Sequence, residues 1–233
     1  MFEGEIMTYN NIKQALFINR INRFVAEIDI DGKRELCHVK NTGRLRELLV
    51  KDAKVYVEEH DSAERKTKFS LVAVQKGERV VNIDSQAPNK VFCEWAQNGG
   101  FLDGVTLIKP ETTFGNSRFD CYIETDKGEK AFVEVKGVTL EDGGVAMFPD
   151  APTERGVKHL KELCRCIDEG YLAYIVFVIK MKGVHTFTPN RKTHIEFAQA
   201  LEKCQKKGVN IVCVDCNVTP DSLEISERIG IKF

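Results

Sequence analysis

The stretch from Ser117 to Gly137 contains two segments with the alternation of β-strands, joined by a turn. Residues 117–125 and 131–137 are rich in aromatic and β-branched side chains, which favour strands. The sequence Asp-Lys-Gly-Glu at 126–129 places a glycine between them, where a hairpin turn needs positive φ. This stretch therefore predicts a β-hairpin, and its register limits how the rest of the chain can pack.

The register follows from the side chains if the loop consists of residues 126–128, so that Thr125 faces Glu129. One face is then wholly apolar, with the pairs Phe119–Val135, Cys121–Val133 and Ile123–Ala131. The other face carries the pairs Asp120–Glu134, Tyr122–Phe132 and Glu124–Lys130, with Lys136 diagonal to Asp120. A loop one residue longer would mix polar and apolar residues on both faces, which a half-buried sheet does not tolerate.

The polar face brings two carboxylates and an ammonium together. Bare carboxylates this close repel each other, and a divalent cation such as Mg²⁺, or Mn²⁺, removes that conflict. An Asp followed by Glu-x-Lys on the next strand is the pattern of the PD-(D/E)xK nucleases. Asp120 and Glu134 would hold the metal, and Lys136 would orient the attacking water and offset transition-state charge. The alternative is a solvated strand face in which Lys136 pairs with a carboxylate.

Three stretches, two of them within or overlapping the hairpin, carry a resemblance to a known family: Ser-Arg-Phe-Asp at 117–120, Val-Glu-Val-Lys-Gly-Val-Thr-Leu at 133–140, and Phe-Pro-Asp-Ala-Pro-Thr-Glu-Arg-Gly-Val-Lys-His-Leu at 148–160. They resemble the sugar fermentation stimulation protein A family, over nearly the whole chain. The resemblance implies DNA binding, an N-terminal OB-like barrel and a PD-(D/E)xK nuclease-like domain. A family motif, His-Cys-Pro-Asn-Thr-Gly, is matched at 38–43 except that Val39-Lys40 replaces Cys-Pro.

Residues 1–83 predict a small β-domain. Short strands separated by turn signals are expected at 12–18, 24–30, 35–39, 53–57, 69–74 and 79–83, with a helical turn at 43–49. Strands at this spacing indicate a small barrel or sandwich, and the OB assignment itself comes from the family resemblance.

Residues 84–233 predict an α/β (α+β) domain with a restriction-endonuclease-like mixed sheet. We expect helices at 90–97, 156–169 and 194–206, strands at 105–108 and 209–214, and a loop at 141–156. The apolar run 171–179 indicates a strand buried on both faces. In many PD-(D/E)xK folds an acidic residue on the first helix assists the metal, so Glu94 is a candidate third ligand; the alternative is a surface glutamate.

Nine side chains are candidates for nucleic-acid contact: Arg20, Arg23, Lys40, Asn41 and Arg44 in the first domain, and Arg118, Arg155, Lys158 and His159 in the second. OB-type barrels bind nucleic-acid strands by cationic grooves, and a helix start with basic residues suits phosphate. Solvated surface charges are the alternative. The formal net charge of −1 predicts weak, salt-sensitive binding to DNA. RNA is the alternative to DNA as the nucleic acid that is bound.

The remaining features of the sequence limit where the protein is expected to be located and which classes of function are possible. Eight cysteines without an export signal predict a reducing, cytoplasmic setting. Cys213 and Cys216 have metal-ligand spacing, but no second pair exists, so free thiols are expected rather than zinc. The longest apolar run is too short to span a membrane. A metal-dependent nuclease is the leading function, and a non-enzymatic DNA-binding regulator or a binder of phosphorylated small molecules are alternatives; a homo-oligomer is left open.

Overall fold

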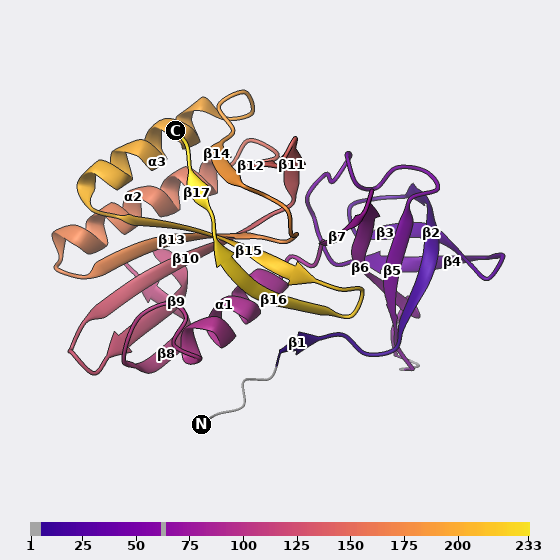
Figure 1. The fold of residues 1–233 in the computed structure, drawn as a ribbon, viewed down its shortest axis with the longest axis horizontal. Coiled ribbons are helices and arrows are strands. Elements are labelled where there is room, and N and C mark those ends of the chain that lie inside the picture. Colours follow the sequence, from indigo (N-terminus) through magenta and orange to yellow (C-terminus); the bar gives the residue numbers. More distant parts are fainter. Residues whose placement is uncertain (1–5, 62–63) are drawn as a thin grey trace.

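The chain forms a β-barrel and a larger α/β domain that lie side by side (Figure 1). The computed structural model describes residues 6–61 and 64–233. The last barrel strand ends at Asn82, and the first helix of the second domain begins at Ala87.

The barrel consists of β2 (Ile12–Arg20), β3 (Val25–Ile30), β4 (Lys33–Val39), β5 (Lys54–Glu59), β6 (Phe69–Lys76) and β7 (Arg79–Asn82). Their order is β4-β3-β2-β5-β6-β7, and a parallel pairing of β4 with β6 closes the barrel. Alternate residues of β3 point inward, so that Ala26 and Ile28 are buried. The expected helical turn forms at Leu45, whose carbonyl accepts from the N–H groups of Leu48 and Leu49. The small closed barrel is thus confirmed.

The second domain is built on a seven-stranded mixed sheet. Its strands, in spatial order, are β1 (Met7–Thr8), β16 (Ser222–Arg228), β15 (Asn210–Val218), β13 (Leu172–Ile179), β10 (Lys130–Val138), β9 (Ser117–Thr125) and β8 (Val105–Phe114). The apolar strand β13 lies in the middle and is parallel to both neighbours, as its unbroken hydrophobicity predicted. β1 belongs to this sheet, although the sequence placed residues 7–8 with the barrel.

Helices cover both faces of this sheet: α1 (Ala87–Gln97) lies on one face, and α2 (Glu154–Asp168) and α3 (Ile195–Lys207) lie on the other (Figure 1). α1 has a proline in its first turn, where a missing N–H costs no hydrogen bond. The Thr153 hydroxyl caps α2 by accepting the N–H of Gly156 at 3.0 Å. α3 ends at Gly208, whose φ of 103° suits a left-handed cap.

Residues 141–156 were predicted to be a loop, and this prediction is wrong except at 149–153. β11 (Leu140–Asp142) and β12 (Val145–Phe148) form a hairpin, which joins β14 (Thr186–Pro189) and β17 (Gly230–Ile231) in a four-stranded sheet. The reason is the Gly143-Gly144 pair, where φ is 56° and 82°. Two consecutive residues with positive φ form the tight turn that suits a hairpin, so the glycines join two strands instead of interrupting them.

Ion pairs dock the barrel onto this hairpin. The buried carboxylate of Glu141 contacts Lys76 at 2.7 Å and Arg79 at 3.0 Å, both from the barrel. Burial acts to raise the pKa of Glu141, but hydrogen bonds from Lys76, the Gly144 N–H and Arg79 lower it to about 2. Glu141 therefore remains charged between the two domains.

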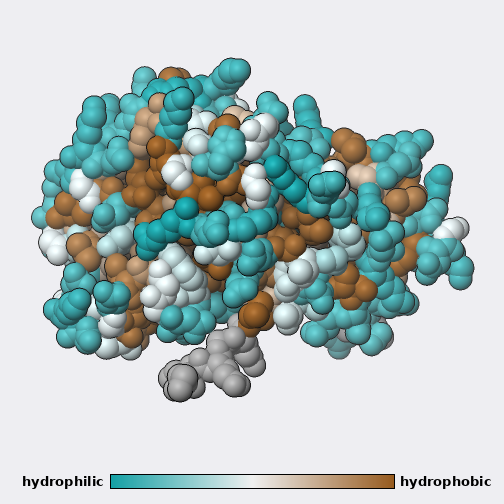
Figure 2. Space-filling view, in the orientation of Figure 1, coloured by the Kyte–Doolittle hydropathy of each residue, from teal (hydrophilic) through white to brown (hydrophobic). Residues whose placement is uncertain are grey.

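The outer surface in Figure 2 is largely hydrophilic, with hydrophobic residues interspersed. Within residues 6–61 and 64–233, no helix combines the length and the apolar character that crossing a bilayer requires. The apolar run that begins at Tyr171 is largely the central strand β13.

Glu141 should make stability pH-dependent in acid. Because its folded-state pKa is depressed, its contribution is present above about pH 4.5 and lost as pH falls toward about 2. Glu141→Gln should lower the free energy of unfolding at pH 7 and flatten the acid decline, measured by urea denaturation at pH 7, 5 and 3. The exposed Glu227→Gln is the control; equal pH profiles for both variants would contradict the prediction.

Candidate active site

The predicted hairpin register is confirmed where the two strands pair. Glu124 pairs with Lys130, Ile123 with Ala131, Tyr122 with Phe132 and Cys121 with Val133. At the turn, the Thr125 N–H donates to the Glu129 carbonyl at 3.0 Å, as the three-residue loop requires. The alternation of side chains was therefore sufficient to fix this part of the sheet.

The ladder ends at Cys121–Val133, and the next residue, Asp120, makes different contacts. One carboxylate oxygen accepts the backbone N–H of Val135 at 2.7 Å, and the other accepts the Asn89 amide of α1 at 2.8 Å. A side-chain acceptor thus takes the Val135 N–H where β9 leaves β10. The predicted cross-strand pair of Asp120 with Glu134 is not part of the ladder.

Phe119 was predicted to share a face with Cys121, and this is wrong. Its ring lies 5.6 Å from that of Phe132 and 6.1 Å from that of His159, on the side of α2. Phe114 and Tyr171 complete this aromatic cluster. Burial among rings outweighs strict alternation at the end of a strand, because aromatic pairs add to the area that they bury.

Glu134 is buried and is held from the side of α2. Its Oε1 contacts both the Lys136 ammonium and Nδ1 of His159, while Arg155 Nε lies 3.4 Å from the other ring nitrogen of His159. The second oxygen, Oε2, is buried and has no hydrogen-bond partner in the described part of the chain. One oxygen is therefore fixed by the protein, and the other is left unsatisfied.

The two carboxylates influence each other electrostatically. Burial raises the pKa of Asp120, and the negative charge of Glu134 raises it further. Burial also acts to raise the pKa of Glu134, but His159 and Lys136 outweigh it and leave that pKa below its ordinary value. Glu134 therefore carries the more persistent negative charge, and a nearby cation would favour ionisation of both groups.

Glu94, the candidate third ligand, lies elsewhere on α1. Its Oε2 accepts the backbone N–H of Met7 at 3.1 Å, and it borders a pocket with Glu224 of β16. Asn89, on a different part of the α1 surface, is the helix residue that reaches Asp120. No group of three or more His, Cys, Asp or Glu side chains in residues 6–61 and 64–233 is placed to hold a metal. The site therefore rests on two carboxylates.

Three of the candidate nucleic-acid contacts hold the barrel loops together. Arg20 donates to the backbone carbonyls of five residues: Asn22, Arg23, Asn41, Gly43 and Arg44. Asn41 donates to the Ile83 carbonyl at 2.6 Å and accepts the Gly43 N–H at 2.7 Å. Lys40 pairs with the buried Asp84 at 2.7 Å. These three side chains therefore make contacts within the protein rather than with solvent alone.

The other candidates divide between the surface and the site. Arg23, stacked on Phe24 with 4.8 Å to the ring centroid, lines an open groove with Arg44, and both are exposed. Arg118 and Lys158 are also exposed. His159, predicted to contact phosphate, is instead buried against Glu134, with Arg155 beside it.

Sequence reasoning missed Asn89 and the positioning role of His159. The available signals were weak: Asn89 follows a proline in the first turn of a helix, and His159 lies one turn beyond Arg155. Neither position reveals which strand the side chain will meet. The CxxC residues Cys213 and Cys216 are buried on β15, where burial raises both thiol pKa values, and all eight cysteines are free.

Comparison with known proteins matches each domain to a family model. The SfsA N-terminal OB domain matches residues 18–83, and the sugar fermentation stimulation protein RE domain matches residues 86–222. The chain is thus an OB barrel followed by a mixed-sheet domain of the restriction-endonuclease-like class. It belongs to the sugar fermentation stimulation protein family.

Relatives match over almost the whole chain. The sugar fermentation stimulation protein homolog of Desulfitobacterium hafniense strain Y51 is 56% identical over 227 residues, covering 97% of this chain and 99% of that protein. The homolog of Clostridium beijerinckii is 56% identical over 225 residues, with the same coverage. A solved structure, Pyrococcus furiosus SfsA in complex with Ca²⁺, has 30% identity and a TM-score of 0.88, and covers 98% of this chain and 99% of that one.

Arg20→Ala should destabilise the barrel rather than act only on nucleic-acid binding. The substitution leaves several loop carbonyls without their charged donor, so we expect a loss of about 1.5–3 kcal/mol in the free energy of unfolding, measured by urea denaturation. The exposed Arg23→Ala is the matched control and should change stability by less than about 0.5 kcal/mol. Similar stability losses in both variants would contradict the structural role of Arg20.

Proposed function

We propose that this protein is a divalent-metal-dependent nuclease that hydrolyses phosphodiester bonds in DNA. Asp120 and Glu134 are the ligands that would hold Mg²⁺ or Mn²⁺. The observation that carries the proposal is Glu134 Oε2, a buried carboxylate oxygen without a hydrogen-bond partner among the described residues. Leaving a charged acceptor buried and unsatisfied costs at least about 1–3 kcal/mol, so such an oxygen is expected to have a partner of another kind.

The donor set fits a hard cation. Mg²⁺ prefers oxygen ligands and usually takes only one or two protein carboxylates, with the remaining positions left to water and substrate phosphate. The two carboxylates here meet that requirement without a third acidic ligand. The Pyrococcus furiosus relative was solved in complex with Ca²⁺, another cation with oxygen ligands, which supports cation binding by this chain.

Side chains of the protein itself hold the Glu134 carboxylate in position. His159 and Lys136 both contact Oε1 of Glu134, which fixes the carboxylate and leaves Oε2 for a cation. A bound metal would polarise the phosphate and lower the pKa of a coordinated water. Lys136 lies beside the carboxylates, where it would orient the water and stabilise negative charge in the transition state.

Exposed cations on both domains would supply contacts for the phosphates of DNA. Arg155 and Lys158 lie at the start of α2, next to the residue that positions Glu134, and Arg23 and Arg44 line a groove on the barrel. OB barrels bind nucleic-acid strands through such cationic surfaces. Because these contacts release counterions, the affinity for DNA should fall steeply with salt.

Replacing the carboxylates should remove metal binding and cleavage together. We expect Asp120→Asn and Glu134→Gln to abolish Mn²⁺ or Mg²⁺-dependent cleavage of labelled DNA and to weaken Ca²⁺ binding at least tenfold by calorimetry. Lys136→Met should retain most of the Ca²⁺ affinity but lose about 100-fold in cleavage rate, since its charge acts on the transition state. Glu162→Gln, at another buried glutamate, is the control and should change neither.

The outcomes separate a nuclease from a regulator that only binds DNA. A wild-type protein that binds DNA but cleaves neither DNA nor RNA in Mg²⁺ or Mn²⁺ would contradict the enzyme and favour the regulator. Cleavage that persists in Asp120→Asn would show that the activity comes from another site. Unchanged Ca²⁺ affinity in both carboxylate variants would remove the metal site from this pair.

A further inference from the structure

A pocket of about 380 Å³ lies where the barrel meets the start of α1. This volume is within the range of small-ligand sites. Its barrel wall includes Phe24, just before β3, His38, near the end of β4, and Arg65, shortly before β6. The opposite wall is formed by Ser85 and Gln86, the two residues that precede α1. Both domains therefore contribute to the pocket.

Phe24 brings an exposed aromatic ring to this pocket. The residue is 43% exposed, yet its backbone is fixed. Its N–H donates to the side-chain oxygen of Asn22 at 2.8 Å, and its carbonyl accepts the N–H of Val39 at 2.8 Å. The guanidinium carbon of Arg23 lies 4.8 Å from the ring centroid. A fixed and exposed ring of this kind is a surface on which an unpaired base can stack.

Arg65 supplies a cation to the same pocket. Its Nη2 donates at 2.8 Å to the hydroxyl of Ser70, which is buried. Within residues 6–61 and 64–233, the guanidinium makes no other hydrogen bond and no ion pair. A guanidinium has five N–H donors, so four remain for a ligand, and their planar arrangement matches the oxygens of a phosphate.

The carboxylates near the pocket are compensated by neighbouring groups. Asp84 is buried, pairs with Lys40 at 2.7 Å and accepts the N–H of Gln86 at 2.9 Å. Lys40 also lies 4.0 Å from Glu58, and His60 lies 3.6 Å from the same carboxylate. Arg65 is therefore the cation of this pocket that is available to an anion.

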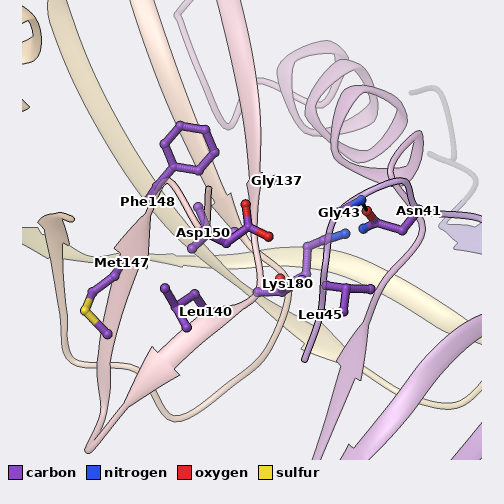
Figure 3. A pocket seen from close by; sticks show the side chains of 11 residues that line it. Asn41, Gly43, Leu45, Gly137, Leu140, Met147, Phe148, Asp150 and Lys180 are labelled. Carbon is purple, nitrogen blue, oxygen red and sulfur yellow. Dashed lines mark hydrogen bonds between the residues drawn. The ribbon is translucent and has the colours of Figure 1, made fainter. Parts of the chain in front are cut away.

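The two walls of the pocket are joined directly. The Ser85 N–H and its hydroxyl both donate to the Lys40 carbonyl, at 2.8 and 3.0 Å. Next along the barrel loop, Asn41 faces Gly137 and Lys180 of the second domain across a small cavity of about 80 Å³ (Figure 3). The pocket is thus preorganised, which reduces the entropic cost of binding.

One turn of α1 connects the pocket to the candidate active site. Gln86, at the start of the helix, has helical dihedral angles, with φ of −92° and ψ of −21°, and Asn89 follows three residues later. Helical residues three apart lie on the same face, about 4.5 Å apart along the axis. The Asn89 amide donates to Asp120 at 2.8 Å. A strand that passes Gln86 is therefore close to the pair of carboxylates.

The pocket also adjoins the cationic groove of the barrel. Thr42 lines both, and Phe24 of the pocket directly follows Arg23 of the groove. The other exposed arginines of the groove are Arg44 and Arg46. The groove, the aromatic ring and the start of α1 thus form a continuous surface.

We propose that this pocket holds an unpaired nucleotide, with its base on Phe24 and its phosphate on Arg65, and that the substrate of the nuclease is single-stranded DNA. A duplex cannot use the ring, because its bases already stack on one another and its outer surface presents mainly phosphates. This inference rests on the proposed function and names the substrate class. The groove would guide the strand, and the pocket would hold it near Asp120.

The test measures binding in EDTA, so that cleavage does not intervene. A fluorescein-labelled strand of mixed sequence and about 16 nucleotides, within the site size of an OB barrel, is used alone and annealed to its complement. Fluorescence anisotropy gives each Kd at several salt concentrations. Because one stacked base contributes about fivefold or more to affinity, wild type should bind the single strand at least about fivefold more tightly than the duplex.

Two variants separate the base contact from the phosphate contact. Phe24→Leu keeps an apolar side chain but removes the flat ring, so it should weaken single-strand binding at least about fivefold and leave duplex binding within about twofold. Its salt dependence should match that of wild type. Arg65→Met removes one phosphate contact, so the slope of log affinity against log salt for the single strand should decrease by about 0.7.

Two matched substitutions lie outside the pocket and should behave as wild type. Phe233→Leu replaces an exposed aromatic residue of the second domain. Arg34→Met replaces an exposed arginine at the other end of β4. All four substitutions are at exposed residues, so the fold should be retained, which thermal unfolding checks.

The outcomes distinguish this inference from the proposed nuclease. Equal affinities of wild type for the single strand and the duplex, or full single-strand affinity in Phe24→Leu, would overturn the pocket and leave the nuclease intact. An unchanged salt slope in Arg65→Met would overturn the phosphate contact. Faster cleavage of the duplex in Mn²⁺ would overturn the substrate class. A protein that prefers single strands through Phe24 but cleaves neither form would support the pocket and contradict the nuclease.

Discussion

The candidate site of the second domain depends on the buried negative charge of Glu134. Removing a carboxylate from water is expensive unless charges and hydrogen bonds compensate for it. Lys136 on the same strand and His159 on α2 provide that compensation at one oxygen only. A buried charged group therefore lies on the side of the sheet that carries α2, and the aromatic cluster around Phe132 packs beside it.

The regular parts of this fold could be predicted because they depend on local patterns. Alternation fixed the pairing of β9 with β10 as far as Cys121–Val133, and unbroken hydrophobicity placed β13 at the centre of the sheet. The end of the ladder could not be predicted in the same way. There, Phe119 turns toward distant rings and Asp120 accepts a backbone N–H, and both choices depend on residues that are remote in sequence.

The same limit applies to the candidate site, where the residue types could be read from the sequence but their contacts could not. The residue types of Asp120, Glu134 and Lys136 were sufficient to suggest a metal, and the site itself remains a proposal. The rotation of α1, which directs Asn89 rather than Glu94 toward Asp120, follows from packing that no short motif records. Arg20 is a similar case, because a basic residue near a loop has the same appearance in sequence whether it binds phosphate or carbonyls.

The position of β1 makes the barrel an insertion rather than an N-terminal appendage. The first described strand, β1, lies in the large sheet; the chain then crosses to the barrel before Ile12 and returns after Asn82. Tyr9 joins the two crossings, since its hydroxyl accepts the Asn82 amide at 2.9 Å and donates to Asp84 at 3.2 Å. Because both connections meet at this hydroxyl, the barrel cannot move relative to the sheet without disturbing the entry and the exit of its chain together.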